Sequence, residues 1–109
     1  GYAKPITKNF GFKPYPGTLN IEIPGELIEL RLQLRARPAF TVPGFSHKGR
    51  ALGPIHCYAC KIGKIPGVIV FPERSHHGLN ILEVMAPANL RKTLKLKDGS
   101  QISVEILEQ

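Results

Sequence analysis

Thr18 and Asn20 are the residues of this 109-residue sequence whose types and spacing best suit metal and phosphate chemistry. They follow a turn at residues 13–17 (KPYPG), where two prolines fix the backbone and Gly17 permits a close approach. If the chain is extended from Thr18, both side chains share one face of a strand. Such a pair of neutral oxygens suits Mg²⁺, which keeps waters and phosphate oxygens as its other ligands. The alternative is a turn in which both side chains only satisfy loose backbone groups.

Glu83 is an acid inside the otherwise apolar run at residues 81–85 (ILEVM). Strand alternation either turns this carboxylate to solvent or requires a specific partner for it, because burying an unpaired charge is costly. Ser75 lies eight residues earlier, in a polar loop at residues 73–80. The two side chains are therefore candidates for sharing one ligand.

A third candidate group follows the Ala-Pro pair at residues 86–87 and opens a short helix predicted over residues 88–94, with Pro87 at its first position. The first residues of this helix are Ala88, Asn89, Leu90 and Arg91. Free backbone N–H groups together with a guanidinium can hold phosphate or sugar oxygens. The alternative is an ordinary connecting helix with Arg91 in solvent.

Cys57 and Cys60 have the CxxC spacing of zinc and redox sites, but there is no second CxxC, and strand residues three apart face opposite sides. Packing as small hydrophobic side chains is favoured, while a local disulfide and a metal site completed by histidines stay open. The candidate histidines are His47, His56, His76 and His77. Neither a GxSxG elbow nor a GxxxxGK[ST] loop occurs, which excludes an ordinary P-loop kinase but not phosphoryl transfer.

Composition indicates how these residues are positioned. Eleven glycines and ten prolines are spaced singly, which is typical of short elements and tight turns in small barrels and sheets. The net charge of +7 predicts attraction to nucleic acid, an acidic surface or phosphorylated small molecules.

We expect one domain over residues 1–109. We also expect a cytoplasmic location, because no apolar run spans a bilayer and no secretory pattern opens the chain. The chain starts at Gly1 without a Met, so we expect missing sequence upstream.

Hydrophobic periodicity predicts the elements. Extended segments are predicted at residues 18–23, 40–45, 55–62, 65–71, 81–85 and 102–106, and a first helix at residues 5–10 that ends at Gly11. Turns are predicted at residues 46–50, 63–64 and 97–100. Residues 26–37 fit both a strand and a helix, and the helix is favoured because acids precede arginines along it.

Four stretches, in this order, resemble the archaeal CTP-dependent riboflavin kinases: GFKPYPGTLN at residues 11–20, PERS at 72–75, EVMAPANLR at 83–91 and LKDG at 96–99. The resemblance spans nearly the whole chain, and PYPGTLN is its most specific part. It implies a mainly β fold, a small six-stranded cradle-loop β-barrel with a few short helices. It also implies phosphorylation of riboflavin to FMN with CTP in place of ATP.

The same resemblance implies roles for individual residues. Thr18 and Asn20 match the ligands of a Mg²⁺ ion that bridges the CTP phosphates. Ser75 and Glu83 match flavin contacts, and Glu83 is also a candidate general base. The nucleotide contacts match Ala88, Asn89, Leu90 and Arg91. The implied partners are CTP or CDP and riboflavin or FMN, bound by a monomer without membrane or nucleic acid.

One family feature has no counterpart in this sequence. The family places a glycine-rich first strand of GxGxG type ahead of the helix that matches residues 2–10, and we expect this segment to be missing from the chain.

Two alternative functions stay open. Residues 90–106 are similar to the swapped-hairpin AbrB-type transcription factors, and the net charge suits contacts to DNA phosphates. A carrier that binds flavin or nucleotide without catalysis is the other.

Overall fold

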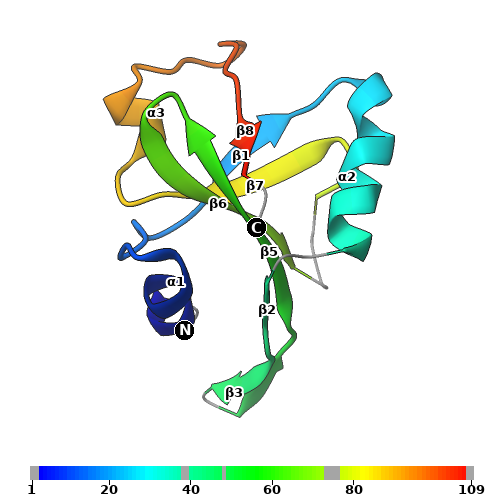
Figure 1. The fold of residues 1–109 in the computed structure, drawn as a ribbon, viewed down its shortest axis with the longest axis vertical. Helices are drawn as coiled ribbons and strands as arrows, with labels where there is room; N and C mark the ends of the chain where they lie inside the picture. The colour runs from blue at the N-terminus through cyan, green and yellow to red at the C-terminus, as the bar shows by residue number, and fades with distance from the viewer. Residues whose placement is uncertain (1–2, 38–39, 48, 73–76, 108–109) are drawn as a thin grey trace.

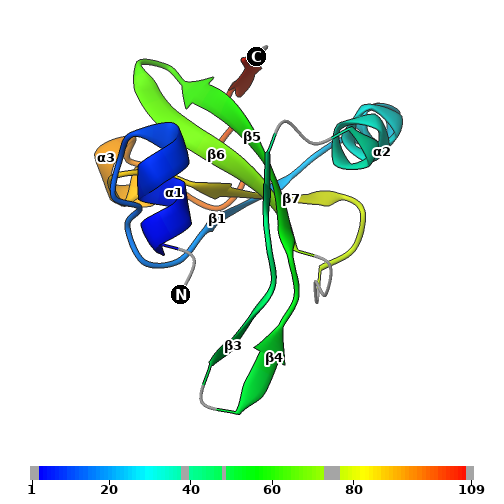
Figure 2. The ribbon, with the colours of Figure 1, turned by 60° about the horizontal axis from the view of Figure 1, so that its bottom comes forward.

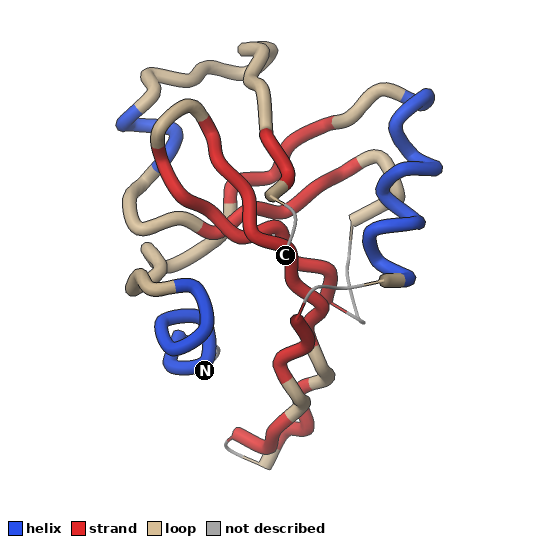
Figure 3. Tube along the Cα trace, viewed as in Figure 1, coloured by secondary structure: helices blue, strands red, loops and turns tan. Residues whose placement is uncertain are grey.

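Figure 1 shows the protein as a computed structural model, which describes residues 3–37, 40–47, 49–72 and 77–107. The strands are β1 (Leu19–Glu22), β2 (Phe40–Val42), β3 (Phe45–His47), β4 (Arg50–Leu52), β5 (Ile55–Ile62), β6 (Ile65–Pro72), β7 (Ile81–Met85) and β8 (Glu105–Ile106). The helices are α1 (Ala3–Phe10), the 3-10 helix η1 (Gly25–Leu27), α2 (Ile28–Ala36) and α3 (Leu90–Thr93). Figure 3 shows the helices at the periphery of the strands.

The main sheet is antiparallel, with its strands in the order β1-β7-β6-β5-β2, and β8 pairs with β5 as the sixth strand. It curls into a half-barrel, while β3 and β4 form a separate hairpin that projects away from it (Figures 1 and 2). The predicted mainly β, six-stranded fold is therefore confirmed. Within the described ranges the sheet is a half-barrel, because β1 pairs with β7 alone.

Two hydrophobic cores lie on opposite faces of this sheet, because successive strand residues point to opposite sides. The first, the barrel core, consists of Cys60, Ile62, Ile69, Phe71, Leu82, Val84, Ala86 and Leu90. The second, the α1 core, consists of Ile6, Val42, Ile55, Cys57, Val68 and Val70. Residues 68–71 of β6 supply both cores and are each at most 2% exposed, which confirms the prediction of a strand buried on both faces.

The helix favoured for residues 26–37 is confirmed as η1 followed by α2. Leu34 on α2 packs against the barrel core, and Arg31 is buried there, so tertiary contacts decide between the two periodicities of this segment. The first helix is confirmed as α1, which Gly11 ends with a φ of +81° while its N–H bonds to the Thr7 carbonyl. The turn at residues 97–100 is also confirmed, with the Ser100 N–H bonded to the Lys97 carbonyl.

Three predicted boundaries are wrong. The helix expected over residues 88–94 is only α3, with Pro87 outside it, because the Asn89 side chain caps the Lys92 N–H and starts the helix at Leu90. The strand expected at residues 102–106 is only β8, because the antiparallel register places residues 102–104 opposite residues 62–64, where β5 ends at Ile62. The loop expected at residues 46–50 is shorter, because residues 46, 47 and 50 pair within the β3–β4 hairpin.

The two cysteines face opposite sides of β5, as their spacing predicts. Cys57 lies in the α1 core and Cys60 in the barrel core, 0% and 1% exposed, and both are free thiols. Burial raises the pKa of each thiol to about 12.

Among the described residues no three His, Cys, Asp or Glu side chains gather as a metal site. In the same part of the chain no helix has the length and hydrophobicity needed to cross a membrane.

Candidate active site

The Pro-Tyr-Pro-Gly turn is fixed against the end of β7. The Tyr15 N–H donates to the Ala86 carbonyl over 2.7 Å, and the Asn89 side-chain amide lies 3.5 Å from the Tyr15 hydroxyl. Gly17 has a φ of +94°, a region in which side chains are strained, so the turn depends on glycine at this position. Two segments far apart in the sequence thereby lie side by side.

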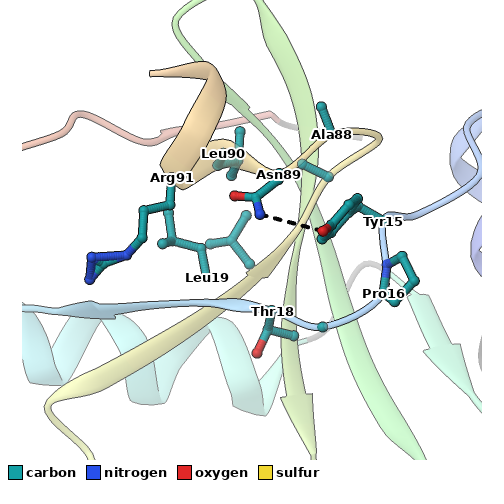
Figure 4. Close-up of a pocket in the computed structure, with 11 residues that line it drawn as sticks. Tyr15, Pro16, Thr18, Leu19, Ala88, Asn89, Leu90 and Arg91 are labelled. Atoms are coloured by element: carbon teal, nitrogen blue, oxygen red, sulfur yellow. Dashed lines mark hydrogen bonds between the residues drawn. The ribbon is translucent and has the colours of Figure 1, made fainter. Parts of the chain in front are cut away.

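A pocket of about 260 Å³ lies between these two segments. Its lining consists of Tyr15, Pro16, Gly17, Thr18, Leu19, Val84, Ala86, Ala88, Asn89, Leu90 and Arg91. The four residues predicted to contact the nucleotide are all among them. Figure 4 shows Tyr15 and Asn89 pointing toward each other in this pocket, whereas Arg91 extends away from both.

The predicted metal ligands are Thr18, which lines the edge of this pocket, and Asn20, which does not. Figure 4 shows the Thr18 and Leu19 side chains on opposite sides of the strand. The Thr18 hydroxyl lies 3.2 Å from the Asn20 side-chain oxygen and 3.5 Å from a Glu83 carboxylate oxygen. A hydroxyl has one proton, so Thr18 donates to one of these two acceptors at a time. The three side chains therefore form one oxygen cluster, which we call the Thr18–Asn20–Glu83 cluster.

Strand register explains why this cluster forms. In the β1–β7 ladder, Asn20 pairs with Glu83, while Leu19 pairs with Val84 and faces the barrel core. The expectation that Thr18 and Asn20 share a face is confirmed, and Glu83 is half-buried beside them rather than fully in solvent. Ser75, the other predicted flavin contact, lies outside the described residues.

The start of α3 differs from the phosphate-binding helix start that the sequence suggested. This helix has four residues, Ala88 and Asn89 precede it, and the Asn89 side chain already occupies the Lys92 N–H at 3.1 Å. Ala88, Asn89, Leu90 and Arg91 therefore contribute to the pocket as lining residues, and not as a row of free helix amides.

Asp98 is a residue of the site that sequence reasoning missed. Both terminal nitrogens of Arg91 donate to one Asp98 carboxylate oxygen, with Nη1 at 3.1 Å. The turn that carries Asp98 is closed by the Lys97 N–H, which donates to the Ser100 hydroxyl over 2.8 Å. The signal in the sequence was the Lys-Asp-Gly turn, whose acid lies seven residues beyond Arg91.

A groove of about 840 Å³ continues from the pocket along the edge of β1 that pairs with no strand among the described residues. Residues 19–24 line one side of it and residues 96–102 line the other. Leu19 and Arg91 line both the groove and the pocket, so the two cavities adjoin. A ligand larger than a nucleobase therefore has room to extend beyond the pocket.

Comparison with known proteins identifies the family. The family model of the CTP-dependent riboflavin kinases, which carries the description "Domain of unknown function DUF120", matches residues 1–106. The chain belongs to the CTP-dependent riboflavin kinase family. This membership confirms the resemblance carried by the PYPGTLN, PERS, EVMAPANLR and LKDG stretches, and it selects that interpretation over an AbrB-type barrel.

Curated riboflavin kinases from archaea are similar to this family member over nearly its whole length. It is 40% identical over 107 residues to the riboflavin kinase of Pyrobaculum aerophilum, covering 98% of this chain and 51% of that protein. It is 42% identical over 107 residues to that of Archaeoglobus fulgidus, covering 98% and 46%. It is 43% identical over 108 residues to that of Pyrococcus furiosus, covering 97% and 50%. The chain spans about half the length of the curated relatives it matches.

Proposed function

We propose that this chain phosphorylates riboflavin to FMN with CTP as the phosphoryl donor. Its family membership and the names of its curated relatives support this activity. The observation that carries the proposal is the β1–β7 register, which brings Asn20 beside Glu83 next to a pocket lined by the Pro-Tyr-Pro-Gly turn. Metal-compatible oxygens, a carboxylate and a cavity of about 260 Å³ adjoin there, as phosphoryl transfer requires.

The positions of the pocket and the Thr18–Asn20–Glu83 cluster indicate how a bound nucleotide would be oriented. We infer that the cytidine lies in the pocket against Tyr15 and Asn89, while the phosphates cross β1 at Gly17 to reach Thr18 and Asn20. A Cβ atom built on Gly17 would meet nothing within 4 Å, so space is open above the turn. The net charge of +7 favours approach of the polyphosphate.

The cluster suits the Mg²⁺ ion that the family resemblance implies. Thr18 and Asn20 offer two neutral oxygens 3.2 Å apart, the donor type that a hard cation accepts, and leave its remaining positions to phosphate oxygens and water. A bound Mg²⁺ would offset the charge that develops on the phosphates during transfer. Thr18 and Asn20 are therefore the residues that we propose to hold it.

Glu83 is the group that we propose to receive the proton. The ribityl 5′-hydroxyl oxygen forms a bond to the γ-phosphorus of CTP, the bond from that phosphorus to the β–γ bridging oxygen breaks, and CDP leaves. The hydroxyl proton passes to the Glu83 carboxylate. Glu83 also orients the hydroxyl in line with the γ-phosphate, together with the Ser75 loop as the further flavin contact.

We also propose that residues 1–109 form one domain that acts as a cytoplasmic monomer and that is completed by the glycine-rich strand expected ahead of residue 2. Supporting the last point, the outer edge of β1 has no strand partner in the described part of the chain and faces the 840 Å³ groove. An open strand edge of this kind is where a further strand would add.

Turnover with a panel of nucleotides tests the proposed activity. Riboflavin and Mg²⁺ are incubated with the chain and CTP, UTP, GTP or ATP, and FMN is separated from riboflavin by chromatography. We expect FMN with CTP and little with the other three. Binding of CDP and riboflavin without any FMN would instead support the carrier alternative, and binding of neither ligand would contradict both.

A further inference from the structure

We propose that Arg31 is a positioning residue, which holds the start of β7 so that Glu83 stays aligned for riboflavin. The inference rests on the proposed function of Glu83. Arg31 lies on α2, an element to which the proposed chemistry assigns no role, and it contacts neither Thr18, Asn20 nor Glu83 through any hydrogen bond. Its effect would therefore pass through the backbone that it contacts.

Arg31 is the one charged side chain that is buried among the described residues, at 9% exposure. Its Nε donates to the Ile81 carbonyl over 3.3 Å, and its guanidinium carbon lies 5.4 Å from the centre of the Phe71 ring. Burial lowers the pKa of Arg31, as does the charge of Arg35, whereas the carboxylate of Glu83 raises it. A buried charge is costly unless specific contacts offset it, so these contacts define where the side chain sits.

The two groups that Arg31 contacts flank the β6–β7 connection. Phe71 is the last fully buried residue of β6, and Ile81 is the first residue of β7. The same corner carries a 2.8 Å bond from the Ile23 N–H to the Asn80 carbonyl. Arg31 therefore ties both ends of the connection to α2, from the barrel-core face of the sheet.

The two ends of β7 are anchored separately. Arg31 holds the Ile81 end, and Glu83 follows two residues later, about 7 Å along the strand. The other end is held by the Tyr15 bond to Ala86, about 17 Å from Ile81 at strand spacing. Loss of Arg31 should therefore disturb Glu83 and riboflavin binding while leaving the nucleotide pocket in place.

Ligand binding tests this separation. Arg31→Met removes the charge and the donor, Arg31→Lys keeps the charge but not the planar fork, and Arg35→Met removes an exposed arginine from the same helix as a control. Riboflavin affinity is measured by quenching of flavin fluorescence, and CDP affinity by calorimetry. We expect Arg31→Met to weaken riboflavin binding about tenfold, the loss typical of one charge-assisted hydrogen bond. Arg31→Lys should fall between Arg31→Met and the wild type, and CDP affinity should stay within about twofold in all three variants.

Hydrogen exchange of the ligand-free chain gives an independent readout. In Arg31→Met, or in Arg31→Lys if the first variant does not fold, the Ile81 and Ile23 amides should exchange faster than in the wild type, and the Tyr15 amide should not. Equal weakening of riboflavin and CDP, or unchanged riboflavin affinity and exchange, would overturn the positioning role. If the wild-type chain binds neither ligand, while the Arg31 variant still shows faster exchange at Ile81 and Ile23, the proposed function is contradicted and the anchoring of β7 by Arg31 stays supported.

Discussion

Asn20 on β1 and Glu83 on β7 are direct partners in an antiparallel ladder, although 63 positions separate them in the sequence. Thr18 adds its hydroxyl to the same cluster, 3.2 Å from Asn20. A shift of the register by one residue would turn Asn20 to the opposite face. The site therefore depends on the β1–β7 pairing as much as on the residues themselves.

The two proposed metal ligands should be essential to turnover. Thr18→Ala combined with Asn20→Ala removes both neutral oxygens, and we expect FMN formation to fall by about a thousandfold or more, since positioning and charge stabilisation supply most of phosphoryl-transfer catalysis. Glu22→Gln, an exposed change two residues further along the same face, is the control. Near-normal FMN formation by the folded double variant, measured with CTP and Mg²⁺, would contradict the assignment.

Glu83→Gln distinguishes a proton acceptor from a binding group. The amide keeps the shape of the side chain but cannot take the hydroxyl proton, so we expect kcat to fall by about a hundredfold or more. The KM for riboflavin should change far less. A variant with unchanged kcat and a raised KM would show instead that Glu83 only holds the substrate.

Arg91, which lines both the pocket and the groove, should contact the nucleotide rather than the flavin. Arg91→Ala is expected to raise the KM for CTP by about tenfold, the usual loss for a charge-assisted contact to phosphate, with the riboflavin KM unchanged. Lys92→Ala, which removes the exposed charge of the next residue, should leave both KM values near those of the wild type. If the two substitutions raise the KM for CTP equally, the effect comes from the net charge of the protein and not from a contact of Arg91.

Asn89 should contribute to folding as well as to the pocket. Its side-chain oxygen caps the Lys92 N–H, so Asn89→Ala should lower the free energy of unfolding by about 1 kcal/mol. Asn89→Asp keeps the capping oxygen but loses the donor that faces Tyr15, and it should keep most of the stability. Urea unfolding of the three proteins measures both effects, and a similar loss in both variants would contradict the capping role.

Stability should fall at alkaline pH because of the two buried thiols. Their pKa is about 12 in the folded chain, against about 8.5 for an exposed cysteine, so the unfolded chain loses these protons first. Stability from this source is complete below about pH 8.5 and declines up to about pH 12, by about 1.4 kcal/mol per pH unit for each thiol. Thermal unfolding across this interval should show a shallower decline in Cys57→Ala than in the wild type, whereas parallel slopes would refute the coupling.

Local patterns were sufficient for most elements. Residues 55–62 and the apolar run after them were predicted as strands, and they form the antiparallel pair β5 and β6. The common face of Thr18 and Asn20 followed from the strand period alone. Residues 26–37 needed a helix-dipole argument, since the leucine pattern by itself allowed two periods.

Long-range geometry limited the rest. The sequence gives no register between β1 and β7, so the partner of Glu83 was open until the ladder was known. The length of β8 depends on where its register meets the end of β5 at Ile62, which no local pattern encodes. Asp98 and Arg31 were missed for the same reason, because their partners Arg91 and Ile81 are identified only by the folded structure.

Transfer of a labelled phosphate tests the central claim most directly. CTP carrying ³²P in its γ-phosphate is incubated with the chain, riboflavin and Mg²⁺, and the products are separated. The label should move to FMN in wild-type protein and stay in CTP in the Thr18→Ala, Asn20→Ala variant. Label that appears only as inorganic phosphate, or that stays in CTP with the wild-type chain, would contradict phosphoryl transfer to riboflavin at this site.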